Sequence, residues 1–127
     1  MLILPYTERA ISNSGIIATA PVPSPKHILQ SINETLKQTV PSGTKVYLFG
    51  SQARGDARED SDWDILILLD KPKLEGTDYD NISYPLRELG WSVKECINPV
   101  MYTLKDWMKY SFSPFFHNIK EEGIELI

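Results

Sequence analysis

The chain has 127 residues, of which 42% are hydrophobic and 24% are charged. This length and balance predict one compact domain with its own hydrophobic core, and they exclude both a disordered chain and two separate domains. The formal net charge of -4 and the single cysteine, Cys96, exclude a general nucleic-acid-binding face, an internal disulfide and a cysteine-based zinc site.

Apolar runs in the sequence are short. The opening run of residues 1–4 is stopped by Pro5 and lacks the length of a signal-peptide core. No later apolar run approaches the roughly 20 residues that a membrane span requires. We therefore expect a cytoplasmic protein without a membrane partner.

The first candidate helix follows a proline-rich segment. Residues 1–23 show no sustained periodicity and end in Pro21-Val22-Pro23, which predicts an N-terminal arm outside a domain of residues 24–127. Ser24 then provides an N-cap, and Pro25 suits the first helical position. Apolar residues recur at every fourth position up to residue 37, namely Ile28, Ile32 and Leu36. This spacing predicts an amphipathic helix.

Two strand-like runs come next. Residues 45–49 are β-prone and end at Gly50, and residues 51–54 have the composition of a first helical turn. Residues 63–69 are nearly all apolar, which is typical of a central strand buried on both faces. We expect these two strands to be neighbours in the sheet.

A second long helix is predicted in the middle of the chain. Thr77 and Asp80 form a pattern similar to a capping box at its start. Its apolar face continues to Gly90, and Pro85 should kink it.

The last third predicts one strand and two short helices. The run 91–103 is predicted as a long strand, in which Pro99 implies a sheet edge or a bulge. Short helices are predicted at residues 105–110 and from Ser113-Pro114 to Gly123.

Phosphate- and metal-binding residue types gather around the first two strands. Gly50 ends one strand and opens a helical turn, so free backbone N–H groups and the Ser51 hydroxyl can face a phosphate. Asp62 and Asp64 are two positions apart at the start of a strand, so both side chains point to the same face. Two carboxylates this close favour a shared cation, and Mg²⁺ bound to phosphate oxygens fits them. The spacing indicates metal-assisted phosphoryl or nucleotidyl chemistry.

The segment Gly50-Ser51 followed by Asp62-Trp63-Asp64 resembles the signature of the nucleotidyltransferase superfamily that includes DNA polymerase β, and above all its minimal, single-domain members. The likeness is specific over residues 45–69 and looser from 70 to 123. It implies an α/β (α+β) fold with a short mixed β-sheet and helices packed mainly on one face. It also implies that Gly50 and Ser51 bind the triphosphate of a nucleotide, with ATP expected, and that Asp62 and Asp64 bind Mg²⁺.

Arg54 has two interpretations. It matches a frequent arginine of the minimal members, which implies nucleotide binding near the phosphates. The alternative is a surface ion pair with Asp56 or Asp60, which would contribute little to stability.

The third carboxylate of the family's catalytic set has no counterpart here. In the family it lies on a later strand, and the matching run in this chain begins with Asn98. An amide at that position removes a negative charge and a possible base. Glu95 is a weak substitute, because three positions along a strand places it on the opposite face unless Pro99 introduces a bulge.

Two functions follow from the resemblance. The first is a magnesium-dependent nucleotidyltransferase that moves a nucleoside monophosphate to a hydroxyl of a protein or small molecule, with Asp62, Asp64 and Asn98 in the catalytic positions. Minimal members often pair with a small helical protein of the HEPN type in toxin–antitoxin modules, which implies an antitoxin role. The alternative is a nucleotide- or partner-binding module whose chemistry is weakened at Asn98. A domain without any ligand is disfavoured by the combined motif.

Overall fold

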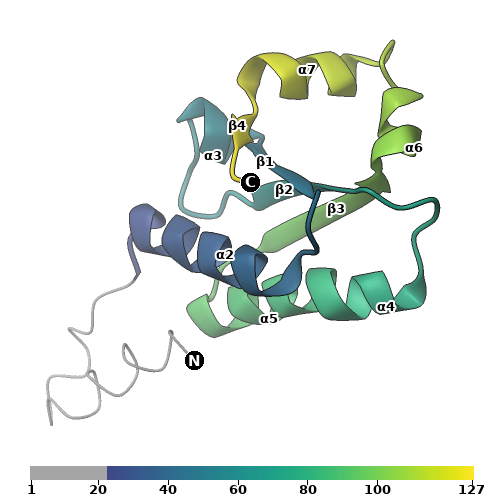
Figure 1. Ribbon diagram of the computed structural model, residues 1–127. Coiled ribbons are helices and arrows are strands. Elements are labelled where there is room, and N and C mark those ends of the chain that lie inside the picture. The colour runs from purple at the N-terminus through teal and green to yellow at the C-terminus, as the bar shows by residue number, and fades with distance from the viewer. Residues whose placement is uncertain (1–22) are drawn as a thin grey trace, which may run out of the picture.

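The computed structural model describes residues 23–127, which form a mixed four-stranded sheet between helices (Figure 1). The strand order is β3-β2-β1-β4. β1 (Lys45–Phe49) is antiparallel to β2 (Trp63–Leu69), and β2 is parallel to β3 (Ile97–Thr103). The predicted fold class and the pairing of the first two strands are confirmed. The predicted arm lies outside the described residues, apart from Pro23.

The longer helices cover one face of the sheet. α2 (Pro25–Thr39) begins as predicted, with Pro25 in its first turn and the Ser24 hydroxyl accepting a hydrogen bond from the His27 backbone N–H at 3.3 Å. It packs beside α5 (Tyr84–Val93) over a core of buried apolar side chains: Ile28, Ile32, Leu36, Val46, Leu48, Trp63, Ile65, Ile67, Leu69, Ile82, Leu86, Ile97 and Met101. This layer holds the main core.

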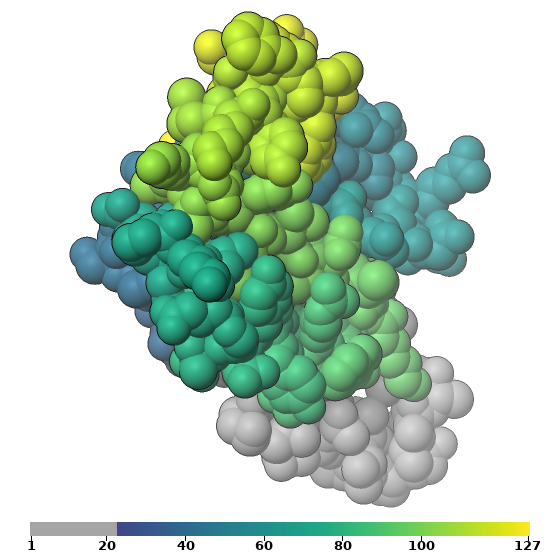
Figure 2. Space-filling model, turned by 90° about the vertical axis from the view of Figure 1, so that its right-hand side faces the viewer, coloured from purple at the N-terminus to yellow at the C-terminus, as the bar shows by residue number. Residues whose placement is uncertain are grey.

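Two short helices, α6 (Leu104–Met108) and α7 (Pro114–Glu122), pack on the opposite face. Their buried side chains Trp107 and Ile119 contact the alternate residues of β2, Leu66 and Leu68. β2 is therefore buried on both faces, which explains its unbroken apolar run. Figure 2 shows this yellow-green part of the molecule above the green helical layer. Among residues 23–127, no helix has the length and apolar character needed to cross a membrane.

The middle helix differs from its prediction at both ends. A capping box joins Glu75 and Asp78, two residues before the predicted pair, and helical structure then runs through α4 (Gly76–Asp78), η2 (Tyr79–Ser83) and α5. η2 is a π-helical turn just before Pro85, whose ring would crowd the carbonyl one turn earlier in a regular α-helix. The helix also passes the predicted stop at residue 90 and ends at a left-handed residue, Lys94, with φ of 59°.

The third strand is shorter than predicted. Residues 91–93 form the last helical turn, and β3 begins only at Ile97. β3 is an edge strand, and its register with β2 is continuous, so Pro99 marks an edge and not a bulge. The short strand β4 (Ile124–Glu125), which pairs with β1, has no sequence signal strong enough to predict it.

Candidate functional site

Gly50 connects β1 to the short helix α3 (Ser51–Arg54) in a backbone conformation that only glycine adopts easily. Its φ is 75° and its ψ is -160°. A Cβ atom at this position would lie 2.5 Å from Oδ2 of Asp64. The glycine therefore permits both the turn and the close approach of the Asp64 carboxylate.

The first turn of α3 begins without a side-chain cap. The Gly50 carbonyl accepts hydrogen bonds from the N–H groups of Ala53 and Arg54, at 3.0 and 3.1 Å, which starts the helical pattern. Because no side chain caps this end, the N–H groups that begin the turn are available to a ligand. The structure thus places the Gly50-Ser51 turn beside Asp64, as the sequence predicts.

Asp64 lies between the neighbouring strands on the face that carries Leu66 and Leu68. Phe49 of β1 is its partner on one side, and Asn98 of β3 is its partner on the other. The Asn98 Nδ2 group donates a hydrogen bond to Asp64 Oδ1 at 3.1 Å. One carboxylate oxygen is therefore held by the amide, and the other faces Gly50.

Asp62 precedes β2 by one residue and is exposed to solvent. Continued alternation of side chains from β2 would place it on the face of Asp64, and the charges of both aspartates act on Cys96. The neighbouring residue Cys96 is also exposed. The pKa of its thiol is raised, mainly by partial desolvation of the sulfur and next by the hydrogen bond with Asp62. The thiolate is disfavoured, so Cys96 adds no anion to the site at neutral pH.

Glu95 does not join this group. Its carboxylate accepts a hydrogen bond from the Trp63 indole N–H at 3.0 Å, and Trp63 points to the opposite face of β2 from Asp64. The expectation that Glu95 is a weak substitute for the third carboxylate agrees with this position. Asn98 is the β3 residue that the fold brings to Asp64.

Arg54 lies at the last position of α3 and makes two ion pairs. Its guanidinium lies 3.3 Å from Asp56 and 3.6 Å from Glu122, with roughly two-fifths of the arginine side chain exposed. The pKa of Arg54 is raised, first by its hydrogen bond to Asp56 and next by the negative charge of Asp56. Glu122 makes a smaller contribution. Of the two interpretations, the structure shows the pair with Asp56, and a phosphate contact stays a prediction.

The side chains at this end of the sheet fit a metal that arrives with a ligand. Within residues 23–127, no group of three or more histidine, cysteine, aspartate or glutamate side chains forms a cage for an ion. Asp62 and Asp64 supply two hard oxygen ligands, and Mg²⁺ is commonly held by one or two carboxylates with phosphate oxygens and water completing its shell. The donor set thus suits a magnesium-bound phosphate compound.

The family model described as "Nucleotidyltransferase domain" matches residues 29–113, which include every residue of this site. The chain belongs to the nucleotidyltransferase domain family. No curated protein gives a significant match to its sequence.

Solved structures show the same fold for this nucleotidyltransferase domain. One is described as a toxin–antitoxin with AMP-PNP; it has 19% sequence identity and a TM-score of 0.56, and the match covers 78% of this chain and 72% of that chain. Another is a mutant of the toxin–antitoxin MntA-HpeT, with 16% identity, a TM-score of 0.55 and coverage of 78% and 71%. At these identities the likeness establishes the fold alone.

Proposed function

We propose that this nucleotidyltransferase domain binds a magnesium-bound nucleoside triphosphate at Gly50, Ser51, Asp62 and Asp64 and transfers its nucleoside monophosphate to a hydroxyl acceptor. The observation that carries the proposal is the position of Asp64, whose carboxylate lies between Gly50 and Asn98. A metal-binding oxygen is thereby next to an uncapped helical turn that can donate hydrogen bonds to phosphates.

In the proposed reaction, the acceptor hydroxyl oxygen bonds to the α-phosphorus, the bond from that phosphorus to the bridging oxygen breaks, and pyrophosphate leaves. The hydroxyl proton passes to solvent. Ser51 and the first amides of α3 bind the phosphates, and Asp62 and Asp64 hold the ion. When bound, Mg²⁺ neutralises charge on the phosphates. Asn98 orients Asp64 but, as an amide, cannot take the proton.

The second candidate function is a nucleotide-binding module with weakened chemistry. The hydrogen bond from Asn98 to Asp64 favours it, because a donor occupies the position where a further carboxylate would complete a two-metal site. Such a module would still bind the ion that accompanies the triphosphate. The two candidate functions share nucleotide binding and differ only in whether the nucleoside monophosphate is transferred.

The structural likenesses suggest the kind of ligand and acceptor. AMP-PNP, in one of the similar structures, is an analogue of ATP and supports an adenine nucleotide. Both similar structures are toxin–antitoxin proteins. This supports an antitoxin role with a protein partner, for which the family resemblance suggests a small helical protein of the HEPN type.

The test is a titration of the full chain with ATP, with and without Mg²⁺, by calorimetry. We expect Mg²⁺-dependent binding that Asp62→Ala and Asp64→Ala each largely remove, because each loses a metal ligand. Asp80→Ala is the matched control, since Asp80 is an exposed carboxylate on the distant π-helical turn. Unchanged affinity in the double variant would rule out the metal assignment. Radiolabelled ATP and a candidate partner then test for transfer.

A further inference from the structure

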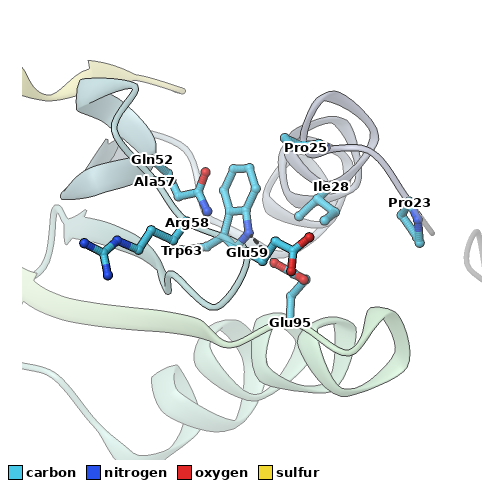
Figure 3. Close-up of a pocket in the computed structure, with 9 residues that line it drawn as sticks. All are labelled: Pro23, Pro25, Ile28, Gln52, Ala57, Arg58, Glu59, Trp63 and Glu95. Carbon is cyan, nitrogen blue, oxygen red and sulfur yellow. Dashed lines mark hydrogen bonds between the residues drawn. The ribbon is translucent and has the colours of Figure 1, made fainter.

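A hollow lies on the other side of β2 from Asp64. It has a volume of about 550 Å³, within the range of small-molecule sites, and lies between the start of α2, the loop before β2 and the start of β3 (Figure 3). Its apolar wall comes from Pro23, Pro25, Ile28 and the buried Trp63. The sequence offered no signal for it, because its walls come from segments distant in the chain.

Two carboxylates face this hollow. In Figure 3, Glu59 and Glu95 point toward the same space beside the Trp63 indole, whereas the guanidinium of Arg58 extends away from it. No ion pair involves either glutamate within residues 23–127. Like charges that converge without a cation repel each other, so an added positive group would be favoured.

Hydrogen bonds hold Glu95 and the loop that carries Glu59 in place. Glu95 donates its backbone N–H to the Gly90 carbonyl at 2.9 Å, and its side chain accepts from Trp63. The loop that carries Glu59 is closed by Arg58 N–H donating to Ser61 Oγ at 2.7 Å and by Ser61 N–H donating to the Arg58 carbonyl at 3.1 Å. The Glu95 charge and the backbone of the loop that carries Glu59 are therefore positioned before any ligand binds, which lowers the cost of binding.

We propose that this hollow binds a small organic cation, a protonated amine or guanidinium on an aliphatic stem. Glu59 and Glu95 pair with the charge, and the prolines, Ile28 and Trp63 contact the stem. A metal ion is a poorer match, since the hollow offers two carboxylates and a mostly apolar wall, and no cluster of three ligating side chains occurs within residues 23–127.

The experiment follows the indole N–H of Trp63 by ¹H–¹⁵N NMR in the full chain without nucleotide, so that its result is independent of the proposed transferase function. Agmatine and spermidine are the probes, and 1,6-hexanediol is the uncharged control. Trp91→Phe and Trp107→Phe assign the three indole signals. We expect both amines to shift the Trp63 signal saturably, with affinity falling as salt rises, and hexanediol to have little effect.

Substitutions separate charge from shape. Glu59→Gln combined with Glu95→Gln keeps the size of both side chains and should weaken amine binding at least tenfold, whereas Glu88→Gln, an exposed site on α5, should not. If the double variant is unfolded, Glu59→Gln alone serves, because Glu59 is exposed in a loop. Equal shifts from hexanediol, or undiminished amine binding in the glutamine variants, would each overturn the proposal.

Discussion

Asn98 changes the charge balance around Asp64. Its amide donates a hydrogen bond to the Asp64 carboxylate. An aspartate at position 98 would instead repel the Asp64 carboxylate. The site is thus ordered without a second cation, and the net negative charge that would attract one is smaller. This favours a single ion that arrives with the triphosphate.

Asn98→Asp should reverse this balance. Without metal we expect a lower unfolding temperature, because two carboxylates then face each other; with Mg²⁺ or Mn²⁺ the loss should be recovered. The affinity for a second metal ion should rise. The rate of nucleotidyl transfer should increase on the order of a hundredfold, because one metal ligand is worth a few kcal/mol in the transition state. Thermal unfolding with and without metal, and radiolabelled transfer, measure both effects. Strong native transfer that is undiminished in Asn98→Ala would contradict it.

Gly50→Ala should be the most damaging glycine substitution around the site. The backbone there is nearly exclusive to glycine, and the new methyl group would meet Asp64 Oδ2. We expect a loss of roughly 2–4 kcal/mol in urea unfolding, together with weaker nucleotide binding.

Two other glycines are matched controls for Gly50. Gly55 has a φ of 86° but open space around it, so an alanine there should cost about 1 kcal/mol from strain alone and leave nucleotide binding intact. Gly76 begins α4 and has open space with no positive φ, so Gly76→Ala should be neutral or stabilising. Equal losses at Gly50 and Gly55 would show that the contact with Asp64 has no energetic role.

The sequence predicts the short-range part of the site better than the long-range part. The Gly50 turn and the shared face of Asp62 and Asp64 follow from local rules, namely the freedom of glycine and the alternation of strand side chains. The link between Arg54 and Glu122 joins residues far apart in the chain, and no local rule brings them together. The same is true of the Trp63–Glu95 bond, which the spacing of the motif does not encode.

At the scale of elements, the boundary between α5 and β3 shows how local propensity is overridden. Residues 91–103 contain valine, isoleucine and tyrosine in a pattern typical of a strand. The first residues of this run instead finish the helix, and Val93 enters the apolar interior from its last turn. Residue 90 is a glycine within the helix because the backbone carbonyl oxygen of Glu95 lies 2.7 Å from where a Cβ atom would be. Tertiary packing decides this boundary, so the sequence alone misplaces it.

The start of the same helical segment depends on a charged cap. Asp78 Oδ2 accepts from the Glu75 N–H at 2.8 Å and pairs with Lys71 Nζ at 2.9 Å. Burial opposes ionisation of Asp78, but the hydrogen bonds from Lys71 and Glu75, with the lysine charge, lower its pKa. The hydrogen bonds to Asp78 and Glu75 raise the pKa of Lys71. Both groups are therefore charged and paired across the neutral range.

Asp78→Ala should lower the free energy of unfolding by about 1 kcal/mol near neutral pH, the usual cost of a lost cap. A lowered pKa in the folded state means that the carboxylate stabilises the protein above its unfolded pKa and loses that effect as pH falls through the folded value. The difference from wild type should thus be full at neutral pH and shrink below about pH 4. Urea unfolding from pH 7 to pH 3 measures it, with Asp80→Ala as the control on the same helix. A difference that stays constant in acid would contradict the ionic cap.

At the scale of the whole molecule, the main core and the proposed binding site lie on opposite faces of the sheet. The main core lies between α2, α5 and one face of the sheet, whereas Asp64 and Asn98 point to the other face, beyond the smaller cluster around Trp107. A substitution at the site therefore leaves most apolar contacts intact. The fold class was predictable from the family resemblance of residues 45–69, and the central position of β2 from its unbroken apolar run, whereas β4 is too short to have a pattern.

A chain that begins at Pro23 should fold as the full chain does. Among the residues that the structure describes, both apolar clusters lie within residues 28–127, and the first helix is capped by Ser24, which this variant retains. We expect the free energy of unfolding to change by no more than about 0.5 kcal/mol, the usual range for changes away from a core, and magnesium-dependent ATP binding to persist. Urea unfolding and calorimetry of the two chains side by side provide the comparison. A loss of several kcal/mol, with the shortened chain partly unfolded in buffer, would show that residues 1–22 complete the core and that the domain does not begin at residue 24.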